Sequence, residues 1–432
     1  MKNITRKNGD EMYALMERLW PLCRSITGDG VRKTLSILRE KLPEMKIYEV
    51  PTGTRCFDWV VPKEWSIRDA YIIGPDGTKI INFSDSNLHV VNYSMPVNME
   101  LDLDDLQSHL HSLPEQPEAI PYVTSYYKEN WGFCMTHNLR VKLAPGKYKV
   151  FIDSELNVGN LTYGEIFFPG HSEKEILLST YICHPSMANN ELSGPCLTAQ
   201  LAQWLRGLNR RFSYRILFLP ETIGAICYLS RHLEHLKAKT IAGYVITCVG
   251  DDLAWSYMPS RKGNALSDLA ARHVLKCFAC DYKEYSFLER GSDERQYCSP
   301  GIDLPVSSVM RSKYATYPEY HTSLDNLHFV TPLGLEKAFD VYQKIIEVIE
   351  ADCIPKNMIL CEPKMSDRGL RPTISKVGSS HSSRDIMNLI AYADGTKSLL
   401  EIAEVINVPA WVLRQMTDNL AKLSILKIEE NN

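Results

Sequence analysis

The segment before residue 42 alternates between apolar and polar positions with the period of amphipathic helices. Apolar residues recur three or four positions apart from Met12 to Leu19 and again from Val31 to Leu38. Gly28 and Gly30 separate the two runs. Because one face of a helix repeats about every 3.6 residues, this pattern predicts two helices, followed by a short apolar strand over residues 47–50.

Between residues 55 and 143 the pattern changes to short runs of β-branched and aromatic residues. The runs that begin at Trp59, Ala70 and Lys79 are separated by turn sequences such as Gly74-Pro-Asp-Gly77. Runs of this length at hairpin distances are typical of antiparallel strands. We therefore expect a β-rich domain, residues 55–143, inserted into the rest of the chain.

After Gly146, strand patterns alternate with helix patterns. The expected strands are residues 148–152, 161–168, 175–182, 214–219, 241–249 and 304–310, and the expected helices are 193–208, 224–236, 265–278 and 333–349. This alternation predicts an α/β domain with a mixed, mostly parallel sheet flanked by helices, to which we assign residues 1–54 and 144–362. Such sheets bind ligands beyond the carboxyl ends of their strands, so the residues that follow strands are candidates for function.

The C-terminal segment, residues 371–432, has its own pattern. A helical run from Leu399 to Val405 ends at Asn407-Val-Pro409, and a second amphipathic run, 412–423, precedes an apolar strand at 425–428. Helix, tight turn, helix and strand is the order of a winged-helix domain. Residues 381–432 contain five basic and seven acidic side chains. Because DNA affinity depends on neutralising phosphates, we expect a protein-packing module and no nucleic-acid partner.

Composition narrows the class of protein. The 432 residues include 48 Lys and Arg against 52 Asp and Glu, a net charge of −4, and 44% are hydrophobic. This balance argues against a nucleic-acid or membrane-surface partner, and no run is apolar for the ~18 residues that a membrane helix needs. The twelve cysteines are dispersed, without the spacing of a disulfide framework or a metal cluster. We therefore expect a soluble, cytoplasmic protein, and whether it forms a homo-oligomer is left open.

Five segments that follow or enter strands are rich in side chains able to bind metal ions or protons. They are residues 184–194, 221–224, 250–252, 291–295 and 320–325. A single loop histidine is more often a hydrogen-bonded residue than a metal ligand. However, the carboxyl ends of parallel strands meet at one edge of a sheet, so we expect these segments to contribute to one site.

The order of these segments resembles that of the zinc aminopeptidases related to bacterial leucyl aminopeptidase and glutamate carboxypeptidase II. The family motifs H-x-D, D-D-x-S-G, E-E-x-G, D-M-V-G and a final His correspond to His184-Pro-Ser186, Asn190-Glu191-Leu-Ser193-Gly194, Glu221-Thr222-Ile-Gly224, Thr247-Cys-Val-Gly250 and His321-Thr322-Ser-Leu-Asp325. The whole chain is also similar to a bacterial family described as aminopeptidase-like with a C-terminal winged helix. The resemblance implies an aminopeptidase-like fold, hydrolysis of a peptide or other small amide substrate, two histidine ligands and Glu221 as the general base.

Three positions depart from the family pattern. The resemblance places Asn190 where the family has a metal-bridging Asp, Thr222 at a ligand Glu and Thr247 at a ligand Asp. Two dications a few ångströms apart repel each other strongly unless anionic ligands bridge them, and a neutral Asn190 cannot do so. We therefore expect one zinc ion rather than two.

Two imidazoles and one carboxylate are a common ligand set for catalytic zinc. His184 and His321 would provide the nitrogens and Glu191 the oxygen, beside Asn190 at the altered position. Glu221 would take a proton from water and pass it to the leaving amine, and Asp325 would orient His321. Further candidates for the metal or the substrate are Asp251, Asp293 and Glu294, and those for binding a substrate carboxylate are Arg290 and Arg295.

Other interpretations of these residues stay open. Glu221 could serve only as a favourable charge at a helix N-terminus, and Ser193 could cap a helix. No G-x-S-x-G turn surrounds Ser193, which argues against a serine hydrolase. The loss of three family ligands also fits a catalytically degenerate protein with a binding or regulatory role. For a hydrolase, a peptide amino terminus, an acylated amino acid and an amide on a modified sugar all fit as the substrate.

Overall fold

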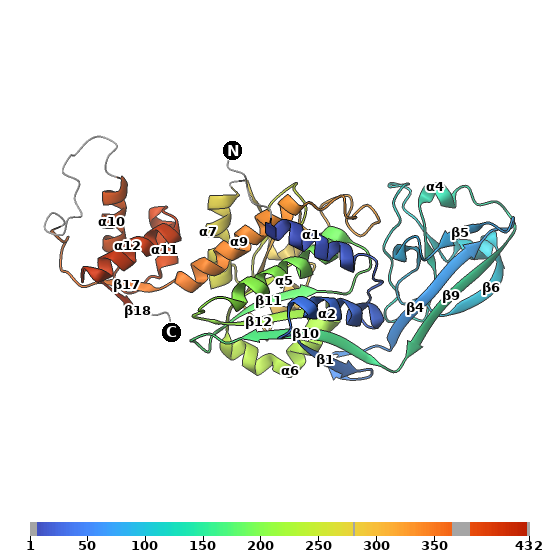
Figure 1. Ribbon diagram of the computed structural model, residues 1–432, viewed down its shortest axis with the longest axis horizontal. Coiled ribbons are helices and arrows are strands. Elements are labelled where there is room, and N and C mark those ends of the chain that lie inside the picture. The colour runs from blue at the N-terminus through green and yellow to red at the C-terminus, as the bar shows by residue number, and fades with distance from the viewer. Residues whose placement is uncertain (1–6, 280, 365–380, 430–432) are drawn as a thin grey trace. The chain divides into compact units, whose positions relative to one another are not determined.

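The computed structural model describes residues 7–279, 281–364 and 381–429. Contacts divide the chain into two compact units, Met1–Ser267 with Tyr282–Asp340 and Asp268–Asp281 with Val341–Asn432. The first unit contains the large sheet and the β-rich region, and the second contains the C-terminal helices (Figure 1). Among the described residues, no helix combines the length and the apolar character needed to cross a membrane.

A mixed sheet of eight strands forms the centre of the first unit. Its order is β1 (Lys46–Pro51), β10 (Asn160–Phe168), β12 (Ser213–Leu219), β11 (Glu175–Tyr181), β13 (Thr240–Val245), β16 (Val306–Met310), β14 (Ser256–Met258) and β15 (Lys283–Glu284). The pairs from β12 through β11 and β13 to β16 are parallel, whereas β1, β10 and β14 join the sheet through antiparallel pairs. The predicted mixed α/β sheet is confirmed, and its central strands bring their carboxyl ends to one edge.

Helices cover both faces of this sheet: α1 (Lys7–Leu19), α2 (Asp29–Lys41), α5 (Ser193–Arg206), α6 (Ile223–Lys239) and α8 (Glu294–Tyr297). Leu177 of β11 packs in one apolar cluster with Leu229 of α6. On the other face, α5 contacts β11 and β12, and α1 and α2 lie beside it (Figure 1). A Cβ added at Gly194 of α5 would lie 2.6 Å from Thr180 Oγ1, so this close approach of helix to sheet requires glycine.

The β-rich region contains a four-stranded antiparallel sheet in the order β5 (Lys79–Asn82), β4 (Glu64–Ile73), β9 (Lys147–Asn157) and β6 (Val97–Asp102). The prediction that residues 148–152 join the α/β sheet is wrong, because β9 pairs with β4 and β6. Tyr148, Val150 and Ile152 complete the core of this smaller sheet, which therefore extends past residue 143. An alternating strand can fit either sheet, so its pattern alone does not identify its partner.

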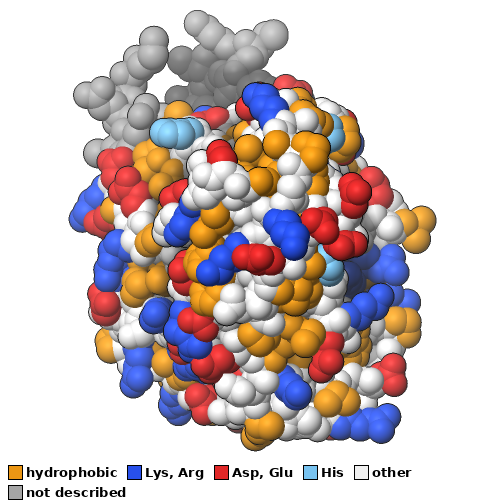
Figure 2. Space-filling model, turned by 90° about the vertical axis from the view of Figure 1, so that its right-hand side faces the viewer, with side chains coloured by type: hydrophobic (Ala, Val, Ile, Leu, Met, Phe, Trp, Pro, Cys, Tyr) orange, Lys and Arg blue, Asp and Glu red, His pale blue; other side chains and the backbone are white. Residues whose placement is uncertain are grey.

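Short elements complete the β-rich region: β2 (Arg55–Cys56), β3 (Trp59–Val60), α3 (Leu103–Gln107), β7 (Leu110–His111), β8 (Phe133–Cys134) and α4 (His137–Arg140). Figure 2 shows acidic and basic side chains interspersed over the face at this end of the molecule. Such a mixed face differs from the continuous basic surface on which nucleic-acid affinity depends.

The second unit has the predicted order of helix, turn, helix and strand. It contains α10 (His381–Tyr392), α11 (Leu399–Ile406), α12 (Ala410–Lys422), β18 (Leu426–Glu429) and parts of α7 (Leu266–Phe278) and α9 (Pro332–Ala351). Ser398 and Glu401 form a capping box at the start of α11, and Asn407 ends this helix with a φ of 56°.

One strand of the second unit lies earlier in the chain than the sequence pattern indicated. β17 (Ile354–Asn357) pairs antiparallel with β18, although we had assigned residues up to 362 to the α/β domain. Within the predicted C-terminal domain, residues 371–380 and 430–432 lie outside the described residues.

Candidate metal and catalytic site

Loops at the carboxyl edge of the large sheet meet at a cavity of about 430 Å³. His184 follows β11, Glu221 lies between β12 and α6, and His321 lies in the loop before α9. All three line the cavity, and the α/β domain also contributes Ile26, Cys183, Thr222, Ile223 and Arg295. Adjacent parallel strands end side by side, which explains why residues far apart in the sequence come together here.

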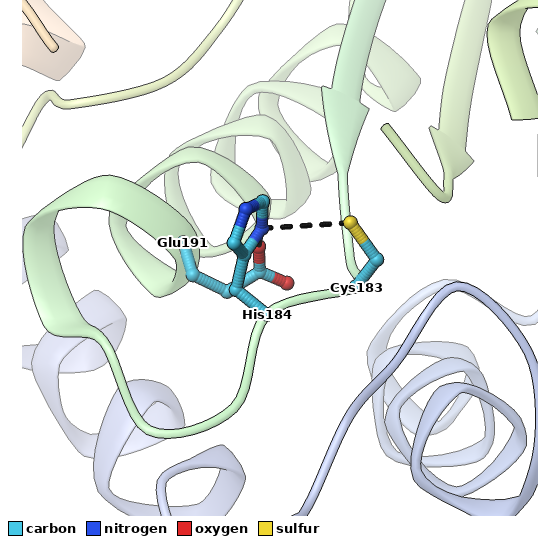
Figure 3. Close-up of side chains that lie close together, drawn as sticks. All are labelled: Cys183, His184 and Glu191. Atoms are coloured by element: carbon cyan, nitrogen blue, oxygen red, sulfur yellow. Dashed lines mark hydrogen bonds and ion pairs between the residues drawn. The ribbon is translucent and has the colours of Figure 1, made fainter. Parts of the chain in front are cut away.

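The His184 ring is held between two carboxylates. Its Nδ1 lies 2.8 Å from Glu191 Oε2, and its Nε2 lies 3.7 Å from Glu221 Oε2. Cys183 Sγ is 3.5 Å from Nδ1, and Figure 3 shows these side chains together. Burial acts to lower the pKa of His184, but the hydrogen bond to Glu191 and the charges of Glu191 and Glu221 together outweigh it, so the pKa is raised. Because Glu191 engages Nδ1, the nitrogen that faces the cavity-lining Glu221 is Nε2.

Glu191 supports His184 from the buried side. Its Oε1 lies 3.5 Å from Arg24 Nε, and both side chains are fully buried. Arg24 also donates from Nε to the His184 carbonyl oxygen (2.9 Å) and from Nη1 to the Leu19 carbonyl oxygen (2.7 Å). The predicted zinc ligand is thus placed away from the cavity, because the π-helical turn Ala188–Leu192 directs Glu191 into the protein. Its observed contacts orient an imidazole.

His321 lies next to His184, with 5.4 Å between the ring centroids and 44° between the ring planes. Its φ of 56° is in the left-handed region, which is uncommon for a residue with a side chain. Tyr320 stacks on the ring at 3.9 Å, and Tyr122 packs edge-on at 5.2 Å. Burial and the neighbouring His184 lower the pKa of His321 to about 3. The ring is therefore neutral near pH 7 and has a nitrogen lone pair available.

Glu221 has the properties of a proton acceptor. Its side chain is 19% exposed. Ser292 Oγ donates to its Oε1 (3.0 Å), and its backbone amide donates to Cys183 Sγ (3.2 Å). Burial raises the pKa of the Glu221 carboxyl, although His184 and Arg295 act in the opposite direction. A carboxyl group whose pKa is moved toward neutrality is suited to accept and return a proton.

The altered family positions carry neutral side chains that already have hydrogen-bond partners. Asn190 Nδ2 donates to Tyr181 OH (2.9 Å), and the Thr247 hydroxyl contacts Tyr181 OH and donates to the Asn190 carbonyl oxygen (2.9 Å). The Thr222 hydroxyl accepts from Arg295 Nη2 (2.6 Å). Asn190 Oδ1 is buried and has no partner among the described residues. These groups provide none of the negative charge that a second zinc ion would need.

Asp251 and Asp325 hold the loop that carries Asn190. Asp251 Oδ2 accepts from Asn189 Nδ2 (2.9 Å). The two oxygens of Asp325 accept the backbone amides of Asn189 (2.7 Å) and Asn190 (2.9 Å). We had expected Asp325 to orient His321, but its carboxylate instead holds this turn, because buried backbone amides require partners. Burial raises the pKa of Asp325 to about 7, although these amides act in the opposite direction.

The two acidic candidates near α8 are likewise engaged within the protein. Glu294 Oε1 accepts the Gly291 amide (2.9 Å) and the Tyr314 hydroxyl (2.5 Å). Asp293 Oδ1 accepts the Thr222 amide (2.7 Å). Burial, followed by the nearby Glu221, raises the pKa of Asp293 well above its usual range. Neither carboxyl group lines the cavity, so the structure brings neither to the predicted metal.

The two arginines predicted to bind a substrate carboxylate, Arg290 and Arg295, differ in their position relative to the cavity. Arg290 is exposed, and its guanidinium lies 5.0 Å from the centre of the Phe287 ring. Arg295 lines the cavity together with His184 and Glu221. Only Arg295 is therefore placed to meet a bound molecule in this cavity.

The side chains at this cavity include the types of ligand that zinc uses. Two imidazoles, those of His184 and His321, line this cavity beside the Glu221 carboxylate, and imidazole nitrogen is a common zinc ligand. Among the described residues, the group whose ligand atoms lie within 4.8 Å of one another consists of Cys183, His184 and Glu191. However, Arg24 places a buried positive charge beside Glu191, which disfavours a dication on that side.

Two features of the site had no clear signal in the sequence. Arg24 lies between two helices without a motif of its own, and its importance comes from a contact with residues far along the chain. The other feature is the aromatic wall of the cavity, which consists of Trp59, Tyr122, Tyr126 and Tyr127. For this wall the sequence offered a hint in the run at 122–127, which contains three tyrosines.

The fold is that of the zinc aminopeptidases. A zinc aminopeptidase from Bacillus subtilis superposes with a TM-score of 0.58 at 10% identity, covering 78% of this chain and 94% of that one. The M28 peptidase precursor of Shewanella amazonensis gives a TM-score of 0.57 at 11% identity, covering 83% and 96%. At these identities the likeness shows the fold alone.

The chain belongs to the family described as Domain of unknown function (DUF4910), whose profile matches residues 13–352, and a winged helix-turn-helix profile matches residues 353–428. A Clostridium acetobutylicum protein is 44% identical over 425 residues, covering 98% of this chain and 97% of that protein. Its provisional name is polysaccharide biosynthesis protein with aminopeptidase-like domain. A crystal structure of a protein provisionally named a peptidase from the same organism has a TM-score of 0.91 at 43% identity, covering 98% and 97%. The predicted aminopeptidase-like fold with a C-terminal winged helix is confirmed.

Proposed function

We propose that the protein is a zinc-dependent amide hydrolase that uses one metal ion, held by His184 and His321. The observation that carries this proposal is the meeting of His184, Glu221 and His321 at one cavity. When bound, zinc in such a site polarises a carbonyl group and activates water for attack. The aminopeptidase-like fold supports this reaction class.

In this proposal Glu221 is the general base and then the general acid. It accepts a proton from the attacking water and returns it to the leaving amine nitrogen, while Ser292 holds its other oxygen. Glu191 keeps Nδ1 of His184 protonated, so that Nε2 can serve as a ligand. Arg24 neutralises Glu191 and holds the backbone of His184 in place.

The substrate class is an amide. Peptides are the substrates expected from the aminopeptidase-like fold, and acylated amino acids and amides on modified sugars also contain the bond to be cleaved. The provisional name of the Clostridium relative points toward polysaccharide biosynthesis and therefore favours testing sugar amides alongside peptides.

The decisive variant is Glu221→Gln, which keeps the size of the side chain and removes its basicity. For the zinc-loaded protein we expect kcat to fall by about 10²–10⁴-fold, with the fold and zinc content unchanged. Amine release from an amide panel measures the activity, and Glu115→Gln at an exposed position is the matched control. If Glu221→Gln loses zinc instead, Glu221 is a ligand rather than the base. The proposal fails if the folded wild-type protein binds less than about one tenth of an equivalent of zinc.

A second candidate function is binding or regulation without catalysis. It is favoured by the neutral groups at Asn190, Thr222 and Thr247 and by the position of His184 between two carboxylates. A protonated His184 would balance these charges without a metal ion, which agrees with its raised pKa. Under this alternative, Glu221→Gln and wild-type protein would give the same result across the amide panel.

A further inference from the structure

The walls of the cavity come from two different parts of the first unit. The α/β domain supplies the candidate catalytic groups, whereas the β-rich region supplies Trp59, Tyr122, Thr124, Tyr126 and Tyr127. The β-rich wall contains no charged side chain among these five. It is therefore suited to select the substrate rather than to perform the chemistry.

Trp59 and Tyr127 form an exposed aromatic pair on this wall. Their side chains are 39% and 54% exposed, and their ring centroids are 5.7 Å apart with 66° between the planes. Large aromatic rings left open to solvent beside a cavity can stack on an apolar or ring-shaped part of a ligand. Tyr122 and Tyr126 lie on the same wall with their hydroxyls hydrogen bonded to each other (2.6 Å).

Arg295 provides a positive charge at the cavity. Its Nη2 donates to the Thr222 hydroxyl, and its buried Nε has no hydrogen-bond partner among the described residues. A guanidinium with free donors is the side chain best matched to a carboxylate. The Thr222 hydroxyl is uncharged, so this contact leaves the guanidinium its positive charge, which also acts to lower the pKa values of the nearby Glu221 and Asp293.

The same cavity is unfavourable for a free ammonium group. A substrate with a free amino terminus needs a carboxylate to pair with its charge, and Glu221 is the one acidic side chain among the described residues that line the cavity. In the proposed reaction Glu221 is committed to proton transfer. Arg295 would in addition repel the ammonium.

We infer that the substrate is a small N-acylated molecule that carries a carboxylate and has no free amino group. Its carboxylate pairs with Arg295, and its ring or apolar part packs on Trp59 and Tyr127. N-acyl amino acids and N-acyl sugar acids share this chemistry. Hydrolysis adds water across the C–N bond, so the oxygen joins the carbonyl carbon to give a carboxylate, and the nitrogen leaves as an amine. This inference rests on the proposed function for the reaction, but it makes its own prediction about binding.

Equilibrium binding to the zinc-loaded full chain tests the inference without requiring turnover. The probes are N-acetyl-L-phenylalanine, its carboxamide, and L-phenylalaninamide, which has a free amine. N-acetylmuramic acid against N-acetylglucosamine forms the sugar arm, because the first has a carboxylate that the second lacks. In at least one arm the acid should bind about tenfold or more tightly than its neutral partner, consistent with a charge-assisted contact. The arm with the larger ratio shows whether the acid is an N-acyl amino acid or an N-acyl sugar acid.

Variants connect this preference to the residues. Arg295→Gln should remove the preference for the acid by raising its Kd, and Arg295→Lys should restore part of it. Arg290→Gln is the matched control, since Arg290 is exposed and does not line the cavity. Trp59→Ala should raise the Kd of N-acetyl-L-phenylalanine more than that of N-acetylglycine.

Two results would overturn the inference: tighter binding of L-phenylalaninamide than of both acids, or an equal effect of Arg295→Gln on acidic and neutral probes. If the acids bind as expected and no amide is hydrolysed, the inference about the ligand stands and the proposed function fails. Hydrolysis that is restricted to substrates with a free amine would keep the proposed function and reject the inference.

Discussion

The two nitrogens of the His184 ring lie in contrasting environments. On the Nδ1 side, Glu191 and Arg24 are fully buried and form an ion pair at 3.5 Å. On the Nε2 side, Glu221 is 19% exposed and lines the cavity. Both sides place a glutamate near the same imidazole. The difference shows that the surroundings of a carboxylate decide its role: Glu191 is paired with Arg24 inside the protein, whereas burial raises the pKa of the cavity-lining Glu221.

The largest expected effect is on the buried side. Arg24→Met should lower the free energy of unfolding by about 3–5 kcal/mol, because it leaves Glu191 buried without its cationic partner. Urea unfolding followed by circular dichroism measures this change. The control is Arg68→Met, which removes an exposed ion pair with Asp153 and should leave the midpoint unchanged. If both variants behave alike, the buried pair does not support the site.

A smaller effect is expected on zinc binding. Glu191→Gln should weaken zinc affinity by about 10–100-fold, since it removes the charge that orients and polarises His184 while keeping a hydrogen-bond acceptor. His321→Ala, which removes a proposed ligand, should weaken it further. Competition with a chromophoric chelator measures both, and His328→Ala at an exposed position should have no effect. Equal zinc affinity in Glu191→Gln and wild type would mean that the Glu191 carboxylate does not strengthen zinc binding through His184.

A third effect, on the pH dependence of stability, concerns the turn that carries Asn190 and Glu191. The pKa of Asp325 is about 7 in the folded protein, against about 3.9 in an unfolded chain. Between these values the folded state binds more protons, so the contribution of Asp325 to stability should decline as pH rises from about 4 to 7 and then level off. Unfolding of wild type and Asp325→Asn in the presence of a chelator isolates this contribution. The expectation is contradicted if the free energy of unfolding of wild type, minus that of Asp325→Asn, increases as pH rises over this range.

Much of the architecture followed from local patterns. The period of apolar residues predicted α1, α2, α5 and α6 and the strands of the parallel core, because a buried face repeats at fixed spacing in each element. Ser398 and Glu401 define the start of α11, and Asn407 defines its end. Such ends can be recognised in a sequence because capping depends on neighbouring residues alone. The positions of His184, Glu221 and His321 after strands, in family order, predicted that they belong to one site.

The sequence by itself therefore determined the elements, their order and the side chains available for chemistry. Only the tertiary structure decided which sheet β9 joins, that Glu191 contacts Nδ1 of His184 rather than the cavity, and that Arg24 and Trp59 belong to the site. The physical reason is distance along the chain. Local patterns record whether a residue is buried and on which face, but the partner that completes a strand, an ion pair or a cavity wall comes from segments that approach only when the chain folds.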